Sequence, residues 1–66
     1  MSIGARIREA REDLGMTGSA LAEKIGSDAA TISRWEHDRR EPDAGHLRAL
    51  CDALGVTADY LLGREK

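Results

Sequence analysis

The sequence contains little that could fix its fold covalently, and little aromatic surface. Its single cysteine, Cys51, excludes an internal disulfide. Phe is absent and Trp35 and Tyr60 are the only aromatic residues, so a core must be built mainly from aliphatic side chains. No apolar stretch approaches the roughly 20 residues that a membrane-spanning helix needs. Residues 1–15 contain three Arg and no continuous apolar run, which argues against a signal peptide. We therefore expect a cytoplasmic chain without a membrane partner.

An excess of positive charge is also missing. Ten Lys and Arg residues stand against twelve Asp and Glu residues, which gives a net charge of −2. This balance argues against binding nucleic acid through bulk charge, although it allows a basic stripe on one face. With 66 residues the chain is expected to form a single domain over 1–66 with a small core.

Apolar residues recur with helical spacing along the whole chain, and no segment alternates as a strand would. The pattern predicts an all-α fold of five helices. Their expected ranges are about 3–14, 18–25, 29 to 36 or 37, 44–54, and a short helix after residue 57.

Residues typical of helix ends stand at these boundaries. Side chains that cap a helix N-terminus precede four of the helices, namely Thr17, Asp28, Asp43 and Thr57. Glycines follow the first, second, fourth and last helices, at Gly15, Gly26, Gly55 and Gly63. The apolar face of the first helix is expected to consist of Ile3, Ile7, Ala10 and Leu14.

Only three residues, 26–28, separate the second and third helices, so the two must cross steeply at close range. Close crossing requires a small residue on the first of them, which Ala22 provides. The turn requires a residue that accepts positive φ, which Gly26 provides. Ile32 then supplies a branched side chain to fill the junction. This spacing predicts a helix-turn-helix over about residues 18–37.

The chain resembles the phage-repressor and Cro family of helix-turn-helix domains, also described as lambda-repressor-like or XRE-type. The matching stretches are "IGARIREAREDLGMT", "LAEKIG", "TISRWEHDRREPD" and "LRALCDALGVTADYLLG". The resemblance implies a compact five-helix domain whose third helix enters the major groove of DNA. It also implies a sequence-specific transcriptional regulator, a repressor that binds double-stranded DNA as a homodimer on a near-palindromic operator. The dimer is expected to be weak and strengthened on DNA.

The resemblance assigns DNA contacts by position. The residues implied to read bases are Ala29, Ala30, Ser33 and Arg34. The residues implied to contact the DNA backbone are Thr17, Gly18, Ser19, Asp28, Arg39 and Arg40. The Arg34 fork suits guanine O6 and N7, and a backbone contact is the alternative. A solvated loop is the alternative role for Arg39 and Arg40.

Two features depart from the family pattern. Gly18 stands where the family usually has Gln, a side chain that clamps a phosphate and braces the third helix. Acidic residues at Asp28, Asp38 and Glu41 are expected near the DNA face, where they would repel phosphates. We therefore expect weak monomer binding that falls sharply with salt.

The resemblance further implies structural contacts. Arg11 and Glu36 are implied to form an ion pair between the first helix and the end of the third. The two-fold contact of the dimer is implied to involve Val56, Tyr60 and Leu62. Helical spacing places Trp35 in the core rather than stacked on a base.

The remaining candidate residues carry no motif of catalysis or metal binding. Cys51 shares an apolar stripe and is expected to behave as a small hydrophobe. His37 and His46 lack the arrangement of a metal site and are expected to be solvated. We predict no enzyme, no cofactor and no metal. The alternative function is a protein-interaction module, such as an antitoxin or adaptor, which the acidic balance and Gly18 favour.

Overall fold

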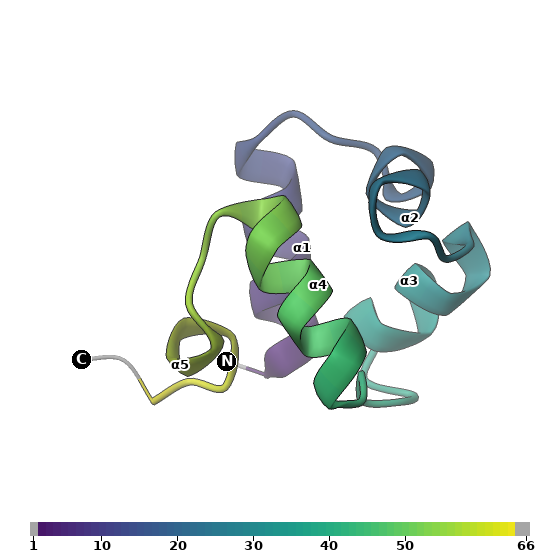
Figure 1. The fold of residues 1–66 in the computed structure, drawn as a ribbon. Coiled ribbons are helices and arrows are strands. Elements are labelled where there is room, and N and C mark those ends of the chain that lie inside the picture. Colours follow the sequence, from purple (N-terminus) through teal and green to yellow (C-terminus); the bar gives the residue numbers. More distant parts are fainter. Residues whose placement is uncertain (1, 65–66) are drawn as a thin grey trace.

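The computed structural model describes residues 2–64, and within this range every regular element is a helix. The elements are α1 (Ile3–Asp13), α2 (Gly18–Ile25), α3 (Ala29–Glu36), α4 (Ala44–Leu54) and α5 (Ala58–Leu61). In Figure 1, α4 crosses α1, with α2 and α3 on one side and α5 on the other. The prediction of an all-α, five-helix fold is confirmed. None of the described helices has both the length and the apolar character to cross a membrane.

Each helix is preceded by a residue whose side-chain oxygen accepts a hydrogen bond from the backbone N–H three residues later, as expected of N-caps. These residues are Ser2, Thr17, Asp28, Asp43 and Thr57. Four of them were predicted, and only Ser2 was missed. Between α2 and α3, Gly26 adopts the left-handed conformation with φ 71°, and this residue turns the chain sharply enough for the two helices to cross.

All five helices contribute to one core. Its fully buried large side chains are Ile7, Leu21, Ile32, Leu50 and Leu61. Ala22 of α2 and Ile32 of α3 are both buried in this core, which agrees with the spacing argument. Trp35 is only 4% exposed, so it belongs to the core and is not available to stack on a base. One side of α3 therefore packs against α1 and α2.

The predicted apolar face of α1 is wrong at its last residue. Leu14 is 54% exposed, because α1 ends at Asp13 and the backbone of Leu14 has already left the helical conformation. The buried face instead consists of Gly4, Ile7 and Ala10, so it starts one residue after the predicted Ile3, which is only half-buried. A Cβ atom on Gly4 would collide with the carbonyl oxygen of Trp35. The lack of a side chain at Gly4 therefore allows α1 to lie directly against the end of α3.

Candidate nucleic-acid interface

The outer side of α3 carries the four residues that were predicted to read bases. Ala29, Ala30, Ser33 and Arg34 are all exposed, whereas Ile32 and Trp35 face the core on the other side of the helix. Three of the four side chains are small, so this face lets another surface approach the helix closely. Arg34 supplies its one long donor.

Because α2 packs on α3, the first residues of α2 are the next candidates for a DNA contact. Thr17 and Ser19 are exposed and Gly18 is half-buried. The Thr17 hydroxyl is already engaged, since it accepts a hydrogen bond from the Ala20 N–H at 3.0 Å. A Cβ atom on Gly18 would meet only the Ile32 side chain, at 3.9 Å. The position therefore has room for a side chain, and its glycine is not required by packing.

The carboxylate of Asp28 lies at the start of α3. It accepts a hydrogen bond from the Thr31 N–H at 2.8 Å. This bond, with a smaller contribution from the Arg34 charge, lowers the pKa of Asp28. The negative charge is therefore held at the positive end of the helix dipole, which offsets part of its repulsion toward an anion.

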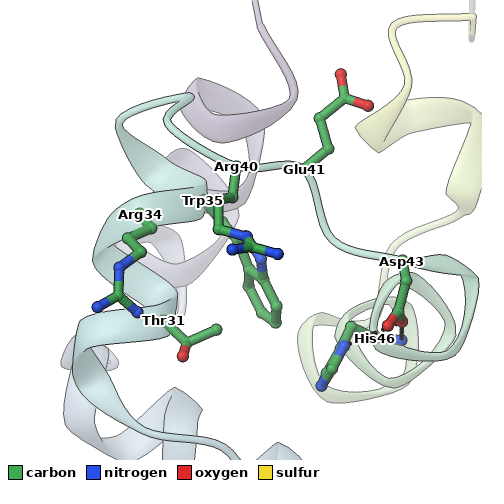
Figure 2. A pocket seen from close by; sticks show the side chains of 7 residues that line it. All are labelled: Thr31, Arg34, Trp35, Arg40, Glu41, Asp43 and His46. Atoms are coloured by element: carbon green, nitrogen blue, oxygen red, sulfur yellow. Dashed lines mark hydrogen bonds and ion pairs between the residues drawn. The ribbon is translucent and has the colours of Figure 1, made fainter.

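A hollow of about 310 Å³ separates α3 from the start of α4 (Figure 2). It is lined by Thr31, Arg34, Trp35, Arg40, Glu41, Asp43 and His46. Arg34 comes from α3 and Arg40 from the loop that follows it. The structure thus brings together two arginines that were predicted for different parts of the DNA. Glu41 also borders the hollow, but its carboxylate points away from the two arginines in Figure 2, and its repulsion of phosphates stays a prediction.

His46 is not simply solvated, contrary to the prediction. Its ring lies 5.1 Å from the Trp35 ring, and its Nδ1 lies 3.0 Å from Oδ1 of Asp43. Asp43 also accepts a hydrogen bond from the His46 backbone N–H, which lowers the pKa of that carboxyl. The sequence signalled only the backbone bond, because a residue three positions after an N-cap carries the N–H that the cap accepts. His37 is exposed as predicted, although its Nδ1 lies 2.8 Å from the Ser33 carbonyl oxygen. Nowhere between residues 2 and 64 do three His, Cys, Asp or Glu side chains cluster as a metal site would require.

Asp38 is exposed, and its carboxylate is engaged by the first turn of α1. Its Oδ1 accepts a hydrogen bond from the Gly4 N–H at 3.1 Å, so the carboxylate points back to the N-terminus of α1. The expectation that the Asp38 charge repels phosphates stays a prediction. Arg39 and Arg40, the next two residues, are both exposed.

Arg11 and Glu36 form a two-pronged ion pair, as the resemblance implied. Arg11 donates from Nε to Glu36 Oε2 at 2.7 Å and from Nη2 to Oε1 at 3.0 Å. It also donates to the Met16 carbonyl at 2.7 Å. The hydrogen bonds to Glu36 raise the pKa of Arg11. The pair joins α1 to the end of α3 and to the loop that leads into α2.

The residues implied for a dimer contact lie around α5. Leu62 is 40% exposed, and Val56 and Tyr60 are half-buried. The guanidinium of Arg6 lies 5.4 Å from the centre of the Tyr60 ring and covers part of it. A shallow hollow of about 220 Å³ is lined by Val56, Tyr60 and the residues between α4 and α5. Leu61 is fully buried and unavailable for such a contact.

Comparison with known proteins assigns this architecture to a family. A helix-turn-helix family model matches residues 7–61, and the chain belongs to this family. Over 66 residues the chain is 39% identical to the HTH-type transcriptional regulator ImmR of Bacillus subtilis (strain 168), matching all of this chain and 52% of that protein. Over 60 residues it is 40% identical to Repressor protein C2 of Salmonella phage P22, matching 91% of this chain and 28% of that protein. The chain thus spans about half or less of the length of these relatives.

A solved structure has the same fold. The P22 c2 repressor in complex with a synthetic operator superposes with a TM-score of 0.94 and 37% identity, over 98% of both chains. A solution structure of the P22 c2 DNA-binding domain gives a TM-score of 0.88 with 38% identity, over 92% of this chain and 80% of that one. The family resemblance is thereby confirmed. The prediction that the chain is not an enzyme agrees with membership in this family.

Proposed function

We propose that this domain binds operator DNA through the outer face of α3, and that it is the DNA-binding part of a transcriptional repressor that acts in the cytoplasm. The observation that carries the proposal is the exposed face of α3, small except for Arg34, with further arginines directly after it. The same fold occurs in a repressor solved with its operator. A short-sided helix is suited to the major groove, because it brings the backbone close to base edges.

Direct reading of bases is assigned mainly to Arg34. Its guanidinium has the fork that suits guanine O6 and N7. The methyl groups of Ala29 and Ala30 can pack on a thymine methyl group, and the Ser33 hydroxyl donates or accepts. With a single long donor on this face, α3 is expected to specify few base pairs per half-site.

Phosphate binding is assigned to Arg39 and Arg40, and to the free N–H groups at the start of α2 near Gly18 and Ser19. Thr17 and Asp28 are proposed to contact the DNA backbone as well, although the side chains of both already act as helix caps. Glu41 follows Arg40 in the sequence, and the net charge of the chain is −2. A single domain therefore offers little net positive charge to attract DNA. Its affinity is therefore expected to be low and steeply dependent on salt.

A weak homodimer on a near-palindromic operator compensates for the few contacts of one domain. Val56, Tyr60 and Leu62 are the residues proposed for the two-fold contact. Because Arg6 covers part of Tyr60, the apolar surface available is small. DNA is expected to strengthen the dimer by holding two domains about one helical turn apart.

The test is a fluorescence anisotropy titration on duplex DNA selected from a random pool, compared with random duplex at several salt concentrations. Arg34→Ala is expected to weaken binding to the selected DNA by about 1–3 kcal/mol. Arg40→Ala is expected to weaken both DNAs and to lower the salt slope by about one. Arg8→Ala removes an equal charge on α1, where Arg8 pairs with Glu12, and serves as the matched control.

The alternative is a module that binds a protein partner, and the acidic balance of the chain favours it. Absence of DNA binding even at low salt would refute the repressor proposal in favour of this alternative. Equal losses for Arg34→Ala and Arg8→Ala would refute the assignment of α3 as the reading helix.

A further inference from the structure

We propose that Asp38 is a positioning residue that anchors the arginine loop, residues 37–42, to the N-terminus of α1. In this role Asp38 orients Arg39 and Arg40 toward the DNA backbone, although its own charge opposes DNA binding. The inference rests on the proposed function and concerns the same surface.

Asp38 directly follows His37, the C-cap of α3, and its backbone turns the chain out of the helix. Among the described residues it is the only non-glycine with positive φ, at 58°. Its N–H bonds to the Trp35 carbonyl at 3.1 Å, and the N–H of Arg39 bonds to the Arg34 carbonyl at 2.9 Å. Asp and Asn tolerate this left-handed conformation better than other non-glycine residues. The chain therefore leaves α3 in one defined direction.

The side chain of Asp38 satisfies a donor of α1. The first N–H groups of a helix have no partner within it. Ser2 Oγ accepts from the Ala5 N–H at 3.1 Å, and Asp38 Oδ1 accepts from the Gly4 N–H at 3.1 Å. The carboxylate also lies at the positive end of the α1 dipole. Only glycine permits this approach, since a Cβ atom on Gly4 would lie 2.7 Å from Asp38 Oδ1.

The anchor fixes the loop at its first turn, and the capping of α4 by Asp43 fixes the chain just beyond its other end. Arg39 and Arg40 lie between these two points. A loop that is already ordered loses less conformational entropy when its side chains engage phosphates, so its binding is tighter. The anchoring role predicts that removal of the Asp38 side chain weakens DNA binding. Charge alone predicts that it strengthens binding, because an acidic side chain near DNA is removed.

Two variants of the full chain separate the anchoring of the loop from the effect of the Asp38 charge. Asp38→Asn removes the charge but keeps a side-chain acceptor for the Gly4 N–H and keeps tolerance of positive φ. Asp38→Gly keeps the backbone conformation and removes the acceptor. Anisotropy titrations on selected and random duplex DNA over a salt series supply the affinities. Circular dichroism at the same temperature confirms that each variant is folded.

We expect Asp38→Gly to weaken binding to both DNAs about two- to tenfold, the range that one lost hydrogen bond gives. We also expect it to lower the salt slope. Asp38→Asn should bind no more weakly than the parent. In a background of Arg39→Ala with Arg40→Ala, the Asp38→Gly change should have little further effect, because Asp38 acts through these arginines. A purely structural role would produce the same loss in both backgrounds.

Unchanged or tighter binding by Asp38→Gly, or an equal loss in both backgrounds, would overturn the inference while leaving the repressor proposal in place. If Asp38→Gly does not fold, protection of the Gly4 amide from hydrogen exchange in the parent and in Asp38→Asn decides whether the anchor exists. An unprotected amide would overturn it. A parent chain that binds no DNA at low salt would refute the proposed function, and this inference with it.

Discussion

Replacement of Glu36 by Ala tests how strongly the ion pair between α1 and α3 stabilises the domain. The side chains of Arg11 and Glu36 are only 14% and 7% exposed, and two hydrogen bonds join them. Glu36→Ala would leave the Arg11 guanidinium with the Met16 carbonyl as its remaining partner. Removing one partner of a buried ion pair lowers the free energy of unfolding by about 3–5 kcal/mol. Because both side chains keep some access to solvent, we expect a loss of about 3 kcal/mol here.

This loss is large for so small a domain. A chain of this size has a free energy of unfolding of about 3–10 kcal/mol. A loss of about 3 kcal/mol corresponds to a fall in Tm of about 12–24 °C. Thermal and urea unfolding followed by circular dichroism would measure it.

The exposed pair of Arg8 and Glu12 provides a matched control. Its side chains are 55% and 56% exposed, and its closest atoms are 3.3 Å apart. Glu12→Ala should therefore change stability by less than about 0.5 kcal/mol. The double change Arg11→Met with Glu36→Leu should recover much of the loss, because no charge is left buried. The reasoning is refuted if Glu36→Ala costs no more than Glu12→Ala.

Three further predictions concern helix ends. Gly4→Ala should lower the free energy of unfolding by about 3 kcal/mol in urea titrations, because its methyl group would collide with the Trp35 carbonyl; an unchanged midpoint would contradict the close packing. The capping hydrogen bonds favour the ionised carboxylates of Asp28 and Asp43 and so lower the pKa of each in the folded state. The ionised caps therefore stabilise the fold above about pH 4, and this stabilisation is lost as the pH falls further. Replacing both with Asn keeps the caps and should flatten the acid side of the curve of Tm against pH, and an equally steep fall would count against the caps as its cause. Gly18→Gln should tighten binding to selected and random DNA by about tenfold in anisotropy titrations, since the position has room for a side chain that reaches a phosphate; weaker binding would refute this placement.

The sequence by itself determined where the helices lie and how two of them cross. Apolar spacing and capping residues act over a few positions, so they were readable without tertiary information. The spacing of Ala22, Gly26 and Ile32 predicted the helix-turn-helix for the same reason, because each residue meets a steric need of one short turn. It also followed that the residues between Ile32 and Trp35 face outward.

Only the tertiary structure decided the directions of polar side chains near the helix ends. Asp38 bonds to Gly4 across 34 positions of sequence, so no local pattern indicated that its carboxylate accepts a hydrogen bond from the first turn of α1. Leu14 has the spacing of a core residue, yet the helix ends just before it and leaves it in solvent. Local spacing specifies which face of a helix is apolar, whereas the neighbour that a terminal side chain meets depends on how the helices pack.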